Sequence, residues 1–371
     1  MAIHRTSELI SINDLKRHTH SMVPAIEQAV HRVIASGWFV LGPEVCAFES
    51  EFADYCGTGH CVSLANGTEA LELALRALDI GSGKTVLTVA NAGMYSTVAT
   101  LATGAAPVYV DVLPDTLLMD VTDLQRILEH QQVDVIIATH LYGLCADIEG
   151  IVRLGHSHGI PVIEDCAQAH GAQLHGRKAG SFGDVGCFSF YPTKNLGALG
   201  DGGAIVTNHT DIAKKIQQLR QYGWNRKYHA NMENGCNSRL DEIQAAVLRV
   251  KLPMLDQWNN RRRQIAARYT KGIVNPVIIT PRIHASEYVA HLYVIRTRRR
   301  DSLKKYLTAT GIPSDIHYPV PDYAQAFCCH LFEGVEKPVT AQACAEVLTL
   351  PCFPEMSDEE IDFVIDHINL W

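Results

Sequence analysis

The chain has 371 residues, of which 47% are hydrophobic and 19% are charged, and its formal net charge is −8. This composition is typical of a globular protein rather than a disordered one, and the length suits two domains better than one small core. The acidic total argues against a general nucleic-acid-binding surface, which would need a basic patch.

The eleven cysteines follow no metal-binding pattern: Cys328 and Cys329 are adjacent, and no CxxC pair occurs. They indicate reduced, mostly buried thiols in a cytoplasmic protein. The N-terminal residues are polar and acidic where a signal peptide needs an apolar run, and no apolar stretch is long enough to span a bilayer. His156 and His158 stand without further ligands nearby, so we predict no metal site.

The first regular elements are helical, over Ser21–Tyr55, with turns at Gly37 and at Gly42-Pro43. A helix over Thr68–Leu78 follows, and after it strands and helices alternate, which predicts an α/β fold with a mostly parallel central sheet flanked by helices. The expected strands are Cys61–Leu64, Thr85–Val89, Pro107–Val112, Val133–Ile137, Pro161–Ile163, Val185–Phe190 and Gly203–Thr207.

Beyond the strands, the pattern predicts helices over Asp211–Gln221 and Leu240–Leu252. Pro253 interrupts the apolar pattern, and a long helix continues through the basic run Arg261–Arg263. Three arginines in a row could suggest nucleic acid, but in an acidic chain we interpret them as a solvated helix face.

The character of the sequence changes near residue 260, so we predict a large domain over residues 1–255 and a small C-terminal α+β domain over residues 256–371. His291–Ile295 is the expected strand of the small domain. Ser357–Glu360 has the pattern of a capping box that opens a last helix, Ile361–Ile368.

Two polar residues at strand ends have the side chains that a cofactor site needs. Lys194 follows a short apolar strand and enters a glycine-dense loop, and Asp165 follows the apolar strand Pro161–Ile163. A lysine can hold an aldehyde cofactor as a Schiff base, and a carboxylate keeps a pyridine nitrogen protonated, so the pair suits pyridoxal phosphate. The alternatives are a surface lysine and an aspartate that caps a helix.

Three further residues could hold the cofactor's phosphate. Gly67 and Thr68 lie between a strand and a helix, where backbone N–H groups and a hydroxyl can meet an anion. Ser189 alternates with Phe188 and Phe190, so its hydroxyl faces away from them if the strand is regular. Taken singly, each of these residues is also explained by an ordinary turn, cap or strand serine.

With these residues together, the chain resembles the DegT/DnrJ/EryC1/StrS family of pyridoxal-phosphate sugar aminotransferases, which have fold type I. The resemblance runs from about Ile12 to the C-terminus. Its most specific stretches are Asn66–Leu75, Val162–Ala172, Cys187–Val206, Asn237–Gln244 and His317–Pro321.

The resemblance implies that Lys194 is the Schiff-base lysine, that Asp165 pairs with the pyridine nitrogen and that Gln168 lies beside the ring hydroxyl. It assigns the phosphate to Gly67, Thr68 and Ser189. Asn237 would reach the phosphate in the neighbouring subunit, so the active sites would be shared across a homodimer. The implied substrate-binding residues are Tyr191, Arg226, Tyr228, Arg239, His317 and Tyr318.

One position departs from the family pattern. Many members place an aromatic residue over the cofactor ring, and aligning Ser96-Thr97 puts Met94 at that place, with Tyr95 one residue later. The alignment therefore favours Met94 as the residue that covers the ring, and the alternative is a local shift that brings Tyr95 there.

The implied reaction is transamination of a nucleotide-linked keto sugar with L-glutamate as amino donor. The segment Tyr222–Tyr228 followed by Asn237–Glu242 is similar to members that act on dTDP-3-keto-6-deoxyhexoses. The alternatives are a 4-keto sugar nucleotide, a keto-cyclitol, and a non-catalytic regulatory protein on the same fold. The related dehydratases replace the lysine with histidine, and Lys194 argues against them.

Overall fold

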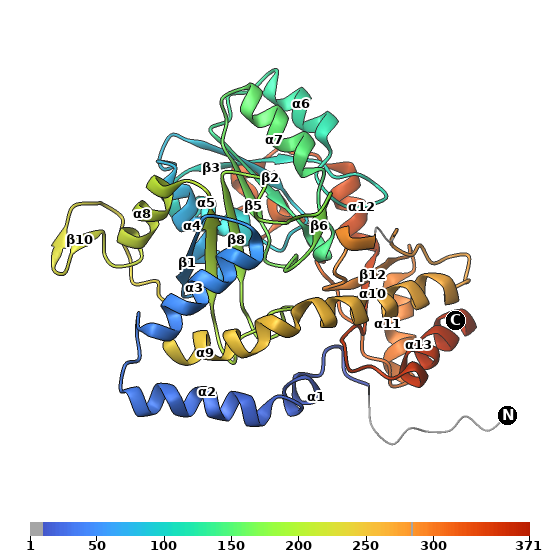
Figure 1. Cartoon of the computed structure of the whole chain (residues 1–371). Helices are drawn as coiled ribbons and strands as arrows, with labels where there is room; N and C mark the ends of the chain where they lie inside the picture. The colour runs from blue at the N-terminus through green and yellow to red at the C-terminus, as the bar shows by residue number, and fades with distance from the viewer. Residues whose placement is uncertain (1–9, 283–284) are drawn as a thin grey trace.

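The computed structural model describes residues 10–282 and 285–371, and Figure 1 shows its central sheet with helices on both sides. The sheet has seven strands in the order β1-β9-β8-β5-β4-β2-β3. These strands are β1 (His60–Leu64), β2 (Thr85–Val89), β3 (Ala106–Val110), β4 (Val135–Thr139), β5 (Val162–Asp165), β8 (Val185–Ser189) and β9 (Gly203–Thr207).

Most neighbouring strands of this sheet are parallel. The pairs β2–β3, β2–β4, β4–β5 and β5–β8 run in the same direction, whereas β9 is antiparallel to both β8 and β1. The fold is therefore α/β with a mostly parallel sheet, as the sequence predicts. Parallel strands end at the same edge of a sheet, so the residues that follow β5 and β8 come together there.

The helices follow the sequence in part. The predicted helices within Ser21–Tyr55, the helix after β1 and the break at Pro253 are confirmed, whereas the helices at residues 15–20, 95–103, 121–128, 148–157, 300–309 and 338–346 were not predicted. The helices are α1 (Leu15–His20), α2 (Val23–Ser36), α3 (Pro43–Cys56), α4 (Gly67–Ala77), α5 (Tyr95–Thr103), α6 (Val121–Leu128), α7 (Ile148–Ser157), α8 (Thr210–Leu219), α9 (Glu242–Lys251), α10 (Leu255–Gly272), α11 (Arg300–Ala309), α12 (Pro338–Glu346) and α13 (Asp358–Leu370).

Alternate residues of β8 pack into two different apolar clusters, one on each face of the sheet. Phe188 packs in the cluster that contains α3 and α9 residues, and Cys187 packs in the cluster that contains α4 and α8 residues. Side chains of a strand point to opposite faces with a period of two, so Ser189 lies on the α4 face. This confirms the expectation that Ser189 faces away from Phe188 and Phe190.

The C-terminal part forms a smaller α+β unit around a two-stranded antiparallel sheet of β12 (Tyr293–Arg296) and β13 (Val347–Leu350). The capping box that opens α13 is confirmed by reciprocal hydrogen bonds between Ser357 and Glu360. One apolar cluster contains residues of β2, β4, α10 and both of these strands, so the unit packs directly on the large sheet. The boundary at residue 255 stays a prediction.

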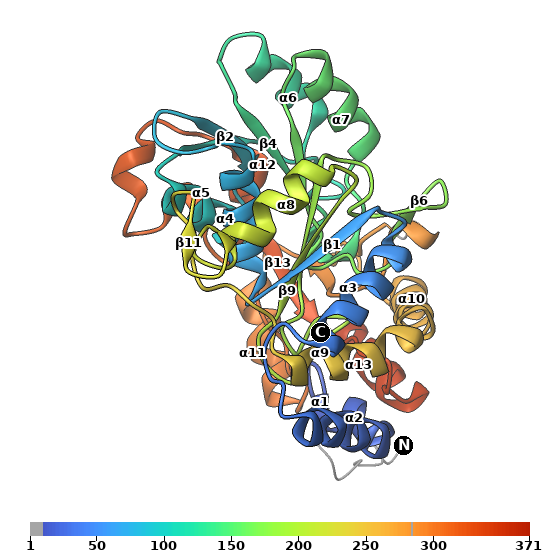
Figure 2. The ribbon, with the colours of Figure 1, turned by 60° about the vertical axis from the view of Figure 1, so that its left-hand side comes forward.

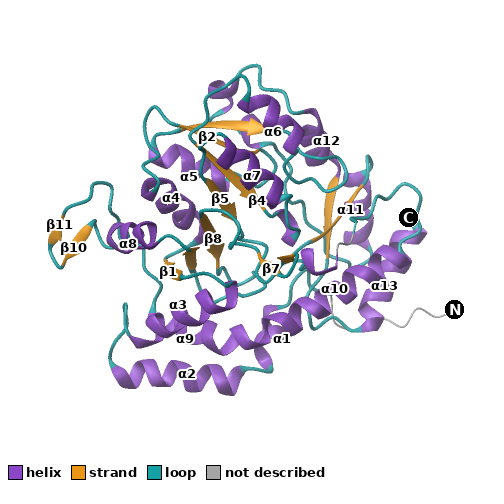
Figure 3. Ribbon diagram, turned by 45° about the horizontal axis from the view of Figure 1, so that its top comes forward, coloured by secondary structure: helices purple, strands orange, loops and turns teal. Residues whose placement is uncertain are grey.

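Four short strands form two small hairpins, β6 (Gln173–Leu174) with β7 (Arg177–Lys178), and β10 (Trp224–Arg226) with β11 (His229–Ala230). The β10–β11 hairpin stands out from the body of the molecule beyond α8 (Figure 1; Figure 3), and in the turned view of Figure 2 it comes to the front. In the described part of the chain, none of the helices has the length and apolar character needed to cross a membrane.

Candidate active site

Lys194 and Asp165 lie at the same edge of the central sheet. Asp165 is the last residue of β5 and pairs with Cys187 of the parallel strand β8, which leads into the lysine loop. The Lys194 amide donates to the Tyr191 carbonyl at 2.8 Å, which closes a tight turn directly after the strand. The parallel pairing of β5 with β8 therefore brings the two residues to the same edge of the sheet, although they are distant in the sequence.

Burial shifts the pKa values of both groups. It lowers the pKa of the Lys194 amine to about 8, and the Asp165 carboxylate opposes this shift. Burial also raises the pKa of Asp165, against hydrogen bonds from the Ala167 amide at 3.1 Å and the Thr139 hydroxyl at 3.5 Å. A lysine that loses its proton near neutral pH can act as a nucleophile and as a general base.

A phosphate-sized cradle is built where α4 begins. Asn66 caps the helix by accepting the Glu69 amide at 2.9 Å, which leaves the first turn's other N–H groups free to meet an anion. A Cβ on Gly67 would lie 2.6 Å from Ser189 Cβ, so the absence of a side chain at Gly67 lets α4 and β8 approach each other. Ser189 Oγ accepts the Tyr191 amide at 3.3 Å.

These groups share one cavity. It has a volume of about 340 Å³, and its walls bring the predicted phosphate residues together with both polar anchors. The lining residues are Asn66, Gly67, Thr68, Leu71, Tyr95, Asp165, Ala167, Ser189, Tyr191, Lys194 and Asp201. A helix N-terminus at one end, a carboxylate at the other and a lysine amine between them fit pyridoxal phosphate.

A second cavity, of about 320 Å³, adjoins the first and is also lined by Lys194, Tyr95 and Tyr191. His317 and Tyr318 line it, as the resemblance implies for residues that bind substrate. Because Lys194 lines both cavities, the second one offers space for a substrate on the other side of the amine.

Gln168 joins the walls of this second cavity. Its Oε1 accepts the Tyr142 amide at 2.6 Å, and its Nε2 donates to the Tyr318 hydroxyl at 3.2 Å. The side chain is 6% exposed, so its amide is held in one orientation by the two bonds. The structure therefore places Gln168 within the site and couples it to the segment that carries Tyr318.

The structure places Tyr95 at the site, and Met94 away from it. Met94 has a left-handed backbone (φ 74°) and its side chain packs against a separate cluster that includes Tyr109 and Phe332. Tyr95 begins α5, lines both cavities and is 48% exposed. The alignment of Ser96-Thr97 favours Met94. In the structure the left-handed backbone at Met94 brings Tyr95 to the cavities instead.

Besides Met94, four predicted residues lie outside both cavities. Arg226 and Tyr228 belong to the projecting β10–β11 hairpin, and Tyr228 is 74% exposed. Asn237 is exposed beside the Gln221 backbone, and Arg239 is half-buried. The single chain brings none of the four to Lys194, and their placement against a second subunit stays a prediction.

Some residues that line the cavities were not predicted from the sequence. Ile12 and Asn13 line the cavity beside His317, and Asn13 Nδ2 donates to the carbonyl of Thr193 at 3.2 Å. Asn66 was named only as the first residue of the stretch Asn66–Leu75, although an asparagine directly before a predicted helix is a typical N-cap. No local pattern marks Asn13, because its partner is far away in the sequence.

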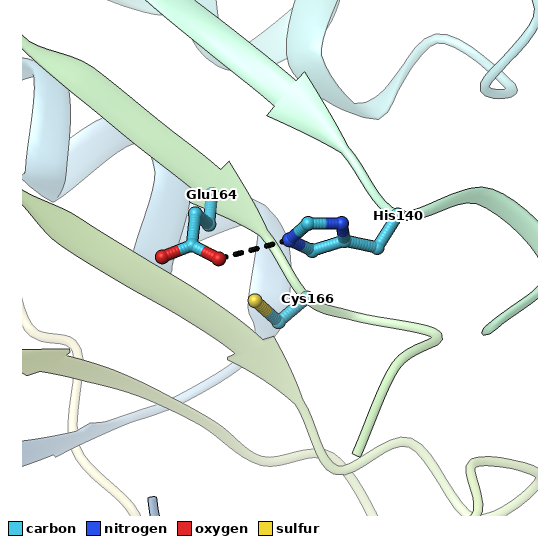
Figure 4. A group of neighbouring side chains, drawn as sticks. All are labelled: His140, Glu164 and Cys166. Atoms are coloured by element: carbon cyan, nitrogen blue, oxygen red, sulfur yellow. Dashed lines mark hydrogen bonds and ion pairs between the residues drawn. The ribbon is translucent and has the colours of Figure 1, made fainter. Parts of the chain in front are cut away.

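One cluster of side chains next to the site has the composition of a metal centre. Figure 4 shows His140, Glu164 and Cys166 pointing toward one another, with a 2.9 Å contact from His140 Nε2 to Glu164. The Glu164 carboxylate also accepts the amides of Gly180, Phe182 and Gly183 at 2.7–2.8 Å. His140 Nδ1 accepts the Ala146 amide at 3.0 Å, so the lone pairs of His140 and Glu164 that a metal would need are already used.

Comparison with known proteins identifies the family of the chain. The sequence profile of the DegT/DnrJ/EryC1/StrS aminotransferase family matches residues 21–369. A dTDP-3-amino-3,6-dideoxy-alpha-D-galactopyranose transaminase of Aneurinibacillus thermoaerophilus is 42% identical over 97% of this chain and 99% of its own length. A UDP-N-acetyl-3-dehydro-alpha-D-glucosamine 3-aminotransferase of Acidithiobacillus ferrooxidans is 40% identical, over 95% of each chain.

The fold has a close counterpart among solved structures. The crystal structure of S. venezuelae DesV in complex with a ketimine intermediate matches with a TM-score of 0.94 and 40% identity, over 98% of each chain. The matches to these relatives and to DesV span nearly the whole chain. The chain belongs to the DegT/DnrJ/EryC1/StrS aminotransferase family, whose members use pyridoxal phosphate.

Proposed function

We propose that this protein transfers the amino group of L-glutamate to C3 of a dTDP-linked 3-keto-6-deoxyhexose. The observation that carries the proposal is the position of Lys194. Its amine lies between a cavity that has a phosphate cradle and Asp165, and a second cavity lined by His317 and Tyr318. This arrangement lets one lysine serve a fixed cofactor and an exchangeable substrate.

The residues then have separate tasks. Pyridoxal phosphate, when bound, supplies an electron sink for charge that develops on carbon. Asp165 keeps the proton on the pyridine nitrogen, and the α4 N-terminus with Ser189 holds the phosphate. Lys194 Nζ takes a proton from the donor's α-carbon and later returns one to the sugar, a task that its lowered pKa suits. Tyr95 covers the ring.

The choice of C3 is supported by the relatives. The Aneurinibacillus and Acidithiobacillus enzymes differ in nucleotide, dTDP against UDP, but both of their names place the amino group at C3. We favour dTDP because the identity is higher to the dTDP enzyme, at 42% against 40%. A 4-keto sugar nucleotide and a keto-cyclitol are the alternatives that an assay must separate.

The projecting hairpin supports a shared active site. Arg226 and Tyr228 offer a cation and an aromatic ring, which suit a nucleotide, but they are exposed and line neither of the cavities around Lys194 in one chain. We propose that they meet the nucleotide, and that Asn237 meets the phosphate, in the second subunit of a homodimer. Isologous contact across a two-fold axis would complete both sites at once.

The test uses purified protein loaded with pyridoxal phosphate. L-Glutamate should bleach the cofactor's visible absorption band, and adding dTDP-3-keto-6-deoxyglucose should restore it, whereas the 4-keto isomer and the UDP-linked 3-keto sugar should restore it far more slowly. Restoration by the 4-keto isomer alone would reject C3. A band that glutamate leaves unchanged would reject glutamate as the donor.

A further inference from the structure

Asp322 is a buried carboxylate that touches neither cavity and yet holds the turn that carries Tyr95. It is 0% exposed and starts the short 3₁₀ helix Asp322–Ala324, a few residues after Tyr318. Its Oδ1 accepts the Met94 amide at 3.1 Å, and its Oδ2 accepts the Thr97 hydroxyl at 2.7 Å. These two residues flank Tyr95 on either side.

The same two segments meet again at Gly93. A Cβ on Gly93 would lie 2.7 Å from Cε1 of Tyr318, so the turn and the ring are in direct contact. The Tyr95 and Tyr318 rings then pack edge-to-face, with centroids 6.2 Å apart. Asp322 thus fastens the turn to the segment that forms the far wall of the second cavity.

A carboxylate is a costly way to make two hydrogen bonds in a buried place. Burial raises the pKa of Asp322 to about 6, and the bonds from Thr97 and Met94 oppose the shift. An asparagine of the same size could accept the Met94 amide and donate to Thr97. The anchor therefore lies in the two hydrogen bonds that Asp322 makes, from Met94 and Thr97.

We propose that Asp322 is a positioning residue for the reaction: its carboxylate holds the Met94–Thr97 turn so that Tyr95 stays at the mouth shared by the two cavities around Lys194. The inference rests on the assignment of those cavities to cofactor and substrate. It adds a residue that acts through Tyr95 without touching either ligand.

The anchor does not depend on the charge of Asp322. Below about pH 6 the carboxylate gains a proton, and the carboxylic acid can still accept the Met94 amide and donate to the Thr97 hydroxyl, so the turn stays held as the pH falls. The titratable groups that face Asp322 stay neutral there, because burial raises the pKa of Tyr109, of Cys328 and of Cys344.

The first test follows hydrogen exchange of residues 93–98 in the apo protein, as protection factors at pH 7.5 and pH 5.5. Asp322→Ala should lose protection at both pH values, whereas wild type and Asp322→Asn should keep it at both. Asp111→Asn is the matched control, because Asp111 also accepts a backbone amide and a threonine hydroxyl, from Thr340. Unchanged protection in Asp322→Ala would overturn the proposal.

The second test is a double-mutant cycle on the dissociation constant of pyridoxal phosphate. Asp322→Ala and Tyr95→Ala should each raise it by about tenfold, the effect expected for one hydrogen bond to a charged group, and the double variant should be no worse. Effects that multiply would show that Asp322 does not act through Tyr95. If wild type fails to bind the cofactor, the site assignment is wrong, while the exchange result still stands.

Discussion

At the scale of single residues, burial moves the pKa values of Lys194 and Asp165 toward each other. Burial disfavours the charged form of each group, so the pKa of the amine falls to about 8 and that of the carboxyl rises. Their mutual attraction opposes both shifts. The result is an amine that is partly neutral near physiological pH, beside a carboxyl that would gain from a cationic partner such as a protonated pyridine.

This pKa gives a prediction for cofactor capture. Only the neutral amine attacks an aldehyde, so the rate at which apo protein captures pyridoxal phosphate should rise with pH and level off above about pH 8. An ordinary lysine would make the rate rise up to about pH 10. Stopped-flow absorbance between pH 6.5 and 9.5 would measure the midpoint, and a midpoint near 10 would contradict the shift.

The matching variant separates chemistry from folding. Lys194→Arg should bind the cofactor without capture and lose all measurable turnover, because a guanidinium stays protonated and cannot attack the aldehyde. Lys271→Arg, at an exposed position, is the control and should behave as wild type. Wild-type turnover in Lys194→Arg would remove the lysine from the mechanism.

At the scale of elements, the start of α4 depends on its contact with β8. Gly67→Ala would place a Cβ 2.6 Å from Ser189 Cβ, and overpacking of this kind costs about 1–3 kcal/mol. We expect the dissociation constant of pyridoxal phosphate to rise by about tenfold, because the shift falls on the phosphate cradle.

The control for this change is Gly59→Ala. A Cβ at Gly59 would have its closest neighbour, Asn208 Oδ1, at 3.7 Å, which is an ordinary contact. Equilibrium titration monitored by absorbance compares the two variants. Equal dissociation constants would show that the approach of α4 to β8 does not shape the cradle.

The elements also show what can be predicted from sequence. Strands buried on both faces, such as β4 and β9, have continuous apolar runs and were predictable. Helix α5 was not, because Thr97, Val98 and Thr100 have low helix propensity, and the helix is stabilised by packing such as that of Ala99 in the α4 cluster.

The same distinction holds at the site. Lys194, Asp165 and Gly67 are visible because strand ends and glycines mark them locally. Met94 was predicted in place of Tyr95 because an alignment does not show that the backbone of one residue is left-handed. Asn13 and Asp322 were missed because their partners, Thr193 and the Met94–Thr97 turn, are distant in sequence.

At the scale of the whole molecule, the proposed homodimer can be tested by mixing variants. Lys194→Ala lacks the amine of its own site, and a combined Arg226→Ala, Asn237→Ala variant lacks the groups proposed to serve the partner's site. If sites are shared, one heterodimer site lacks all three groups and the other is complete. Equal mixing should then restore about a quarter of wild-type activity after subunit exchange.

The control for this experiment is each variant alone, under the same exchange conditions. Both should stay inactive or nearly so, and chromatography coupled to light scattering should show the same assembly as wild type. No gain on mixing, in samples shown to contain heterodimers, would mean that Arg226 and Asn237 serve their own chain or no site.

The second cavity is lined by residues from near both ends of the sequence. Ile12 and Asn13 line it, and Arg17 holds this segment through an ion pair with Glu360 at 2.7 Å and a bond to the Glu355 carbonyl. During synthesis on the ribosome, the sheet and Lys194 emerge long before Glu360. The nascent protein can therefore fold its scaffold early, but the pocket is closed only when translation has reached α13.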